Sequence, residues 1–155
     1  MISYIIENNL GDVLAMLGAA VAFFLAGFGS AKGVSLAGEA ASGVVAEDTD
    51  KFVPAMILEA LPSTQGIYGF VISFMIIQNV GGLDLQQGLF LLFAALPMGI
   101  VGLFSGIYQG RVAAASIGII AKRSQDMAKG IILTLMVELF AIFAILISIL
   151  MIGTV

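Results

Sequence analysis

The chain has 155 residues, of which 61% are hydrophobic and only 10% charged, with a formal net charge of −4. Soluble domains carry about 25% charged residues, so this composition indicates an integral membrane protein. Because the sequence has no cysteine and no histidine, it excludes disulfides, thiol catalysis, cysteine-based metal sites and histidine acid–base chemistry.

Four long apolar segments predict an all-α membrane protein with four transmembrane helices, arranged as two tandem-repeat hairpins. The segments run over residues 13–46, 52–79, 85–121 and 131–152. We expect residues 1–79 to form the first hairpin and residues 80–155 the second. Residues 1–12 hold Glu7 and Asp12 but no basic residue, so no cleaved secretory signal is expected.

Small residues recur at every fourth position of the first and third segments. Residues four apart share a helix face, so each segment presents a groove of glycine and alanine that lets helix backbones approach closely. These two helices suit the curved inner wall of a ring, with the bulkier second and fourth segments outside. The alternative is ordinary packing in a monomeric bundle. The two ladders are Gly29, Gly33, Ala37 and Ala41, and Gly102, Gly106, Gly110, Ala114 and Gly118.

The two hairpins resemble each other in sequence. Residues 25–32 (LAGFGSAK) are similar to residues 104–111 (FSGIYQGR), and residues 70–73 (FVIS) to residues 145–148 (ILIS). When residues 70–73 are aligned with residues 145–148, Ser63 falls at the position of Glu138. The first repeat has therefore lost the carboxylate. Repeats that run in the same direction are related by an axis along the membrane normal.

The fourth segment is 22 residues long, enough to cross a hydrocarbon core of about 30 Å. It holds one charged residue, Glu138, about 10 Å along the helix from Ile131. An ionised carboxylate at that depth is costly unless it has a partner, a bound cation or a proton. We therefore expect an ion-pathway role for Glu138. The alternative is a neutral carboxyl that only holds helices together.

The basic residues predict the orientation in the membrane. All six lie in, or in the helix ends leading to, the loops at 46–52 and 122–129, and none lies on the side with the termini. The positive-inside rule therefore puts both loops in the cytoplasm and both termini outside. The six are Lys32, Lys51, Arg111, Lys122, Arg123 and Lys129.

Polar residues at membrane depth gather around Pro62. This proline has no N–H, so the carbonyl of Leu58 loses its helical partner, and nearby carbonyls become available as ligands. Hydroxyl, amide and carboxylate oxygens with one negative charge suit a monovalent hard cation such as Na⁺. For the two glutamines, hydrogen bonding between helices is the alternative. The polar residues are Glu59, Ser63, Thr64, Gln65, Tyr68, Gln109 and Glu138.

Glu59 is the competing acid, and its place near the cytoplasmic end predicts that it is solvated or paired. The sequence has no phosphate-binding loop ending in GK[ST] and no Ser–His–Asp set, and its loops are too short for a catalytic domain. We therefore expect no catalytic site, no organic cofactor and no nucleic-acid partner on this chain.

Four motifs resemble the membrane rotor-ring proteolipid of V-type rotary ATPases, which is their K (or c) subunit. They are GFGSAKG at 27–33, LPSTQGIYGF at 61–70, GLFSGIYQG at 102–110 and MVE at 136–138. The resemblance covers nearly the whole chain and is closest to the bacterial sodium-translocating branch. It implies a homo-oligomeric ring in a bacterial plasma membrane, with ATP hydrolysed by other subunits.

The resemblance also implies a ligand set and partners. In that branch Na⁺ is held by one backbone carbonyl and four side chains, and a tyrosine, here Tyr68, hydrogen-bonds to the carboxylate. The implied partners are identical protomers, a stator membrane subunit with an essential arginine, central-stalk subunits on the cytoplasmic loops, and lipid. The carried-over ligands are the Leu61 carbonyl, Thr64, Gln65, Gln109 and Glu138.

Two positions depart from the family's pattern, which has a small residue where Tyr108 stands and lysine where Arg111 stands. Neither is a ligand, so the ion assignment is unaffected. The alternatives to a sodium rotor are a proton-translocating ring, a small four-helix cation/proton antiporter that works as a monomer or dimer, and a purely structural proteolipid.

Overall fold

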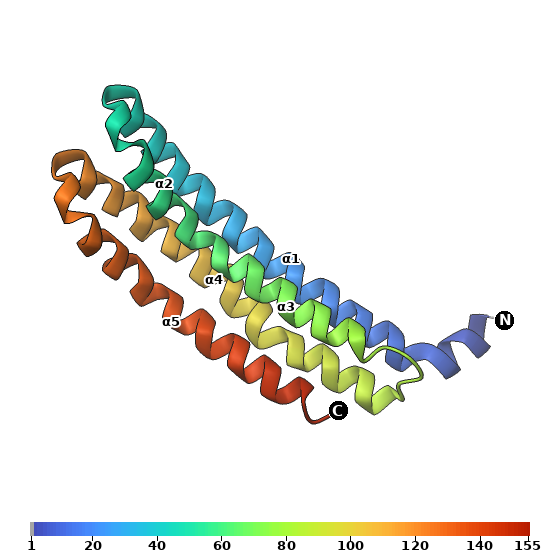
Figure 1. Ribbon diagram of the computed structural model, residues 1–155. Coiled ribbons are helices and arrows are strands. Elements are labelled where there is room, and N and C mark those ends of the chain that lie inside the picture. The colour runs from blue at the N-terminus through green and yellow to red at the C-terminus, as the bar shows by residue number, and fades with distance from the viewer. Residues whose placement is uncertain (1) are drawn as a thin grey trace.

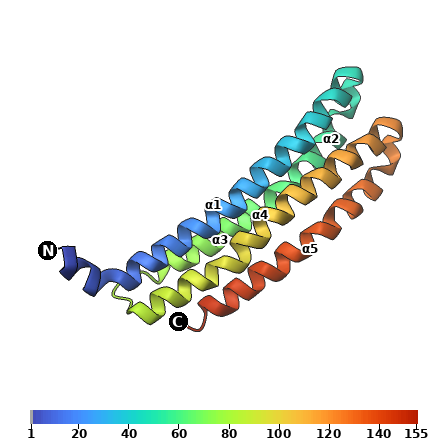
Figure 2. The same ribbon diagram turned by 180° about the vertical axis from the view of Figure 1, so that it is seen from behind.

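Four helical rods lie side by side in an elongated bundle (Figures 1 and 2). This computed structural model describes the backbone of residues 2–155 and the side chains of residues 9–155, so the Glu7 side chain lies outside the described part. Three rods are single helices: α1 (Ile2–Glu47), α4 (Leu85–Lys122) and α5 (Met127–Ile152).

The remaining rod is divided by Pro62. It consists of α2 (Phe52–Ala60), one turn of 3-10 helix at Leu61–Ser63, and α3 (Thr64–Gln78). Proline cannot donate the hydrogen bond that an α-helix needs at this position, so the chain tightens into a 3-10 turn before the α-helix resumes. The described residues therefore confirm the all-α architecture of two helical hairpins.

Each rod is long and apolar enough to cross a membrane. The loops at the ends of α1 and α4 lie together at one end of the bundle, and the C-terminus and the α3–α4 turn lie at the other (Figure 1). Large apolar side chains such as Phe24 and Leu150, each 68% exposed, cover the outside of the rods. This surface is compatible with a lipid environment.

The two hairpins repeat with a constant shift of 75 residues. α1 ends at Glu47 and α4 at Lys122, and the 3-10 turns that follow begin at Thr49 and Ser124. Glu138 therefore corresponds to Ser63, as expected. The expected match of residues 25–32 with 104–111 is wrong by four residues, because a ladder of small residues with a period of four also matches itself one step along.

The glycine ladders bring α1 and α4 into backbone contact. A methyl group on Gly29 would lie 2.5 Å from the Leu103 carbonyl oxygen, and one on Gly106 would lie 2.6 Å from the carbonyl carbon of Gly29. Gly110 lies directly against the backbone of Gly33. This contact confirms the expected close approach of the first and third segments.

The predicted groove does not continue to the end of α4. Residues four apart drift by about 40° around a helix, so a long ladder turns away from a straight partner. Gly118 is accordingly exposed, and apart from its chain neighbours and the adjacent backbone of α4, no atom of the described residues lies within 4 Å of a methyl group built on it. Its place in the core is taken by Ala113, Ile117 and Ile120.

Hydrogen bonds tie the two hairpins together at both ends of the bundle. The Asp12 carboxylate of α1 accepts bonds of 3.0–3.1 Å from the backbone N–H groups of Gly81, Gly82 and Leu83 in the α3–α4 turn. Gly82 has a φ of +86°, a conformation that favours glycine. At the other end, the Lys51 ammonium donates to the Ile120 carbonyl (3.0 Å) and to the hydroxyl of Ser124 (2.7 Å).

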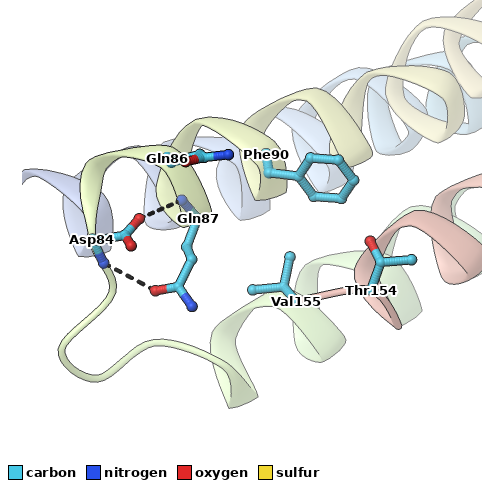
Figure 3. Close-up of a pocket in the computed structure, with 6 residues that line it drawn as sticks. All are labelled: Asp84, Gln86, Gln87, Phe90, Thr154 and Val155. Atoms are coloured by element: carbon cyan, nitrogen blue, oxygen red, sulfur yellow. Dashed lines mark hydrogen bonds between the residues drawn. The ribbon is translucent and has the colours of Figure 1, made fainter.

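A capping box begins α4 (Figure 3). The Asp84 carboxylate accepts from the Gln87 N–H at 2.8 Å, and the Gln87 side-chain oxygen accepts from the Asp84 N–H at 3.1 Å. Thr154 and Val155 complete the wall of an open pocket of about 360 Å³ at this end. The polar groups of Asp84 and Gln87 that line the pocket are already bonded to each other in the cap. We therefore regard the pocket as part of the helix end and not as a binding site.

We predict that Gly106→Ala destabilises the bundle by about 1–3 kcal/mol, because the added methyl overpacks the α1–α4 contact. Thermal or chemical unfolding of the purified protein in detergent would measure this. The matched control is Gly118→Ala on the same helix, which should be neutral or stabilising by up to about 1 kcal/mol. Equal stability of the two variants would contradict the tight contact.

Candidate functional site

One chain of hydrogen bonds links α3, α4 and α5 near the middle of the bundle. The Gln65 amide nitrogen donates to the Gln109 side-chain oxygen at 2.6 Å, and the Gln109 amide nitrogen donates to Oε2 of Glu138 at 3.0 Å. The Tyr68 hydroxyl donates to Oε1 of Glu138 at 2.7 Å. Residues from three helices and both repeats therefore meet at one carboxylate.

The site is almost closed to its surroundings. Gln65 and Gln109 are 0% exposed, and Glu138 is 6% exposed. Each carboxylate oxygen has one neutral donor, but none of the ion pairs among the described residues involves Glu138. An ionised Glu138 therefore has hydrogen bonds but no counter-charge, and it needs a cation or a proton.

The 3-10 turn at Pro62 supplies further oxygens next to Gln65, at the α3 end of this network. The Thr64 hydroxyl donates to the Leu61 carbonyl at 3.1 Å and lies 3.4 Å from the side-chain oxygen of Gln65. A hydroxyl, a backbone carbonyl and an amide oxygen are thus gathered at the start of α3. Oxygens must be gathered in this way if they are to share one small cation.

The donor set has one charge and otherwise neutral oxygens. Among the described residues, no group of three or more His, Cys, Asp and Glu side chains could hold a metal ion. The side-chain amides of Gln65 and Gln109 each carry an NH₂ donor and an oxygen acceptor on the same carbon. Rotating such an amide by half a turn therefore presents its oxygen in place of its NH₂ group. The arrangement can therefore bind a monovalent hard cation, or hold a protonated carboxyl with its present hydrogen bonds.

Two of the polar residues singled out in the sequence lie outside this network. The Ser63 hydroxyl donates to the Ala60 carbonyl at 2.6 Å, which is a local bond within its own rod. Glu59 is partly exposed, and its Oε1 lies beside Gly38 of α1. The structure thus separates Glu59 from Glu138.

The sequence reasoning missed Ser30. Its hydroxyl oxygen accepts a 2.7 Å hydrogen bond from the backbone N–H of Gly66, one residue after Gln65. Ser30 is 6% exposed and ties the first turn of α3 to α1. The only signal in the sequence was its place among small residues of the first segment, which fits packing equally well.

Comparisons with known proteins agree with this architecture. A sequence model of the ATP synthase C-subunit family matches the chain twice, over residues 17–76 and 92–151. The two matches begin and end 75 residues apart, the same shift that relates the helix ends.

Two relatives are similar over most of the chain. The chain is 49% identical over 153 residues to the V-type sodium ATPase subunit K of Enterococcus hirae, and the match covers 98% of both chains. It is 37% identical over 140 residues to the A-type ATP synthase subunit K of Methanocaldococcus jannaschii. That match covers 90% of this chain and 61% of the relative.

We predict that Tyr68→Phe makes Glu138 react faster with a carbodiimide, which attacks the protonated acid. The phenol donates a 2.7 Å hydrogen bond to Oε1 of the carboxylate, so removing its hydroxyl leaves that oxygen open to the reagent. At fixed pH and without added cations, the labelling rate should rise several-fold. Tyr108→Phe is the control, because the described network does not use its hydroxyl. An unchanged rate in Tyr68→Phe would remove this support for the carboxylate.

Proposed function

The chain belongs to the ATP synthase C-subunit family, and we propose that it is the rotor-ring protein of a V-type ATPase that carries Na⁺ on Glu138. The observation that carries this proposal is the buried Glu138, which has hydrogen-bond donors on both oxygens and no counter-charge among the described residues. The relative from Enterococcus hirae is named a sodium ATPase subunit, which favours Na⁺ as the cargo.

The proposed ligands are oxygens of the Leu61 carbonyl, Thr64, Gln65, Gln109 and Glu138. Their groups already touch one another through hydrogen bonds of 2.6–3.4 Å. One carboxylate neutralises one Na⁺, so the loaded site has no net charge. Tyr68 keeps its bond to the carboxylate and restrains it.

A neutral loaded site explains how a rotor can work in a membrane. A charged group facing lipid is costly, whereas a neutralised one crosses the lipid-facing part of the rotation at low cost. At the stator, a positive side chain of the partner membrane protein competes for the carboxylate and releases the ion on the other side. Rotation then converts repeated loading and release into directed transport.

We assign the remaining partners to the two ends of the bundle. We propose that the 46–52 and 122–129 loops face the cytoplasm and contact central-stalk proteins, and that both termini lie outside. The domain boundaries are residues 1–79 and 80–155, one hairpin each. This chain has a transport role, and ATP is hydrolysed by separate members of the complex.

We predict that Na⁺, but not K⁺, protects Glu138 from carbodiimide in a saturable way at fixed mildly acidic pH. A bound cation occupies the carboxylate that must be protonated for the reagent to attack. Thr64→Ala should raise the Na⁺ concentration for half-protection about tenfold, which corresponds to about 1.4 kcal/mol.

Ser63→Ala is the matched control, because the neighbouring hydroxyl bonds only to the Ala60 carbonyl. Its protection curve should match that of the unaltered protein. If labelling follows pH alone and ignores Na⁺, the cargo is a proton, and Thr64, Gln65 and Gln109 only pack the helices.

We also predict that Glu138→Gln abolishes coupled ion transport while the oligomer still assembles. Glutamine has the same shape and can keep hydrogen bonds with Tyr68 and Gln109, but it cannot neutralise a cation. Reconstituted vesicles would report transport, and mass measurement of the complex would report assembly. Glu59→Gln makes the same chemical change outside the network and should leave transport intact. Retained transport in Glu138→Gln would refute the role of this carboxylate.

A further inference from the structure

Ser30 of α1 accepts a hydrogen bond at the start of α3, directly beside the candidate ion site. Its hydroxyl oxygen lies 2.7 Å from the backbone nitrogen of Gly66. That nitrogen belongs to the peptide group that joins Gln65 to Gly66, and this group is planar and rigid, so the bond fixes the backbone of Gln65 itself. Ser30 is only 6% exposed, and the bond is therefore shielded from its surroundings.

The first turn of α3 needs this acceptor because it has no cap of its own. N–H groups in the first turn of a helix have no partner within that helix, and the side chain just before the helix usually accepts from one of them. Ser63 holds this position for α3, but its hydroxyl donates to the Ala60 carbonyl at 2.6 Å and makes no cap bond. Gly66 is the third residue of α3, and its N–H donates to Ser30. A serine from another helix thus caps α3.

Close packing of α3 on α1 brings Ser30 within reach. A methyl group built on Gly66 would lie 3.3 Å from the Ser30 hydroxyl oxygen. One helical turn further, a methyl group on Gly69 would lie 2.6 Å from the side chain of Ala26, which is 0% exposed. Alanine is sufficient for packing at that neighbouring position of α1. The hydroxyl of Ser30 is therefore explained by its hydrogen bond and not by its size.

The second hairpin has the same serine without this bond. The shift of 75 residues relates Ser30 to Ser105, which is also buried, with 5% of its surface exposed. The Ser105 hydroxyl has no hydrogen-bond partner among the described residues. Burial of a serine at this position therefore does not by itself give it a partner.

The helix break at Pro62 explains the difference between the two hairpins. The same shift takes Pro62 to Val137 and Gly66 to Ala141, and both counterparts lie inside the uninterrupted helix α5. In the interior of an α-helix the N–H of Ala141 bonds within its own helix. The N–H that Ser30 accepts is thus available only where the proline interrupts the rod, which is also where the proposed ligands lie.

We propose that Ser30 is a positioning residue for the ion site and holds the start of α3 in the shape that gathers its oxygens. The Thr64 hydroxyl lies 3.1 Å from the Leu61 carbonyl oxygen and 3.4 Å from the side-chain oxygen of Gln65. The bond to Gly66 anchors this short segment to α1. Ser30 is not a ligand and acts through the backbone. This inference rests on the proposed Na⁺ site.

The proposal separates the affinity for Na⁺ from the hydrogen bonding of the carboxylate. Glu138 accepts from Tyr68, in the second turn of α3, and from Gln109 of α4. Neither bond uses the first turn of α3. Loss of the Ser30 bond should therefore misplace the oxygens at the start of α3 and leave Glu138 held as before. A general loosening of the bundle would change both.

Ser30→Ala tests this in the full chain, purified as the assembled complex. We expect the Na⁺ concentration that half-protects Glu138 from carbodiimide to rise about fivefold, which is the usual effect of losing one cap hydrogen bond. The labelling rate without Na⁺ should stay unchanged. Ser105→Ala is the matched control, because it removes the same hydroxyl from the equivalent position, where the described residues offer it no partner. Its protection curve should coincide with that of the unaltered protein.

Hydrogen exchange gives a second measurement that does not depend on Na⁺. In Ser30→Ala the Gly66 N–H has lost its acceptor, so a peptide covering residues 61–70 should take up deuterium faster. The equivalent peptide of α5, residues 136–145, should exchange at the unaltered rate in both variants.

Ser30→Cys grades the effect, because a thiol is similar in size to the hydroxyl but a weaker acceptor. Its half-protection concentration should lie between those of the unaltered protein and Ser30→Ala. If Ser30→Ala yields no folded complex, this variant replaces it, and a protection curve identical to that of the unaltered protein would overturn the proposal.

Two results for Ser30→Ala would also overturn it. One is a protection curve that coincides with that of the unaltered protein. The other is a change in the Na⁺-free labelling rate together with faster exchange along the whole chain, which would make Ser30 an ordinary packing residue.

The unaltered protein separates this inference from the function on which it rests. If Na⁺ does not protect Glu138 in the unaltered protein, the sodium cargo and the positioning role fail together. If Na⁺ protects the unaltered protein and Ser30→Ala equally well, only the positioning role fails.

Discussion

The constraint on which this structure depends is the cost of a carboxylate inside an apolar bundle. Glu138 is 6% exposed and has two neutral hydrogen-bond donors but no positive partner among the described residues. Removing one partner from a buried ion pair is strongly destabilising, so a charge that never had one must be compensated by its cargo. The site is therefore incomplete until an ion or proton arrives.

The glycine contact between α1 and α4 makes the site possible. Because Gly29, Gly33 and Gly106 carry no side chains, α4 lies close enough to the first hairpin for Gln109 to reach Gln65. Pro62 contributes separately, because its 3-10 turn puts the Thr64 hydroxyl beside the Leu61 carbonyl. Packing and a local helix defect thus bring together the residues that we propose as ligands, which come from different repeats.

Sequence alone could predict four helices, the buried acid and the residues gathered around it, because hydropathy and charge at membrane depth are strong signals. It could not predict the Ser30–Gly66 bond, since a serine among small residues is equally suited to packing. It matched residues 25–32 with residues 104–111, which is wrong by four residues, and it extended the groove of small residues to Gly118. Both errors have one cause: a period of four fixes neither the register of a helix nor how far its face stays against a neighbour.

Ser63 stands where the second hairpin has Glu138, so each chain has one carboxylate for every two hairpins. In the rotor that we propose, the number of ions moved per revolution equals the number of chains, which is half the number of hairpins around the ring. The free energy of one revolution is then divided among fewer ions. Each ion receives a larger share of that free energy. The rotor therefore moves fewer ions per revolution but can move them against a steeper electrochemical gradient.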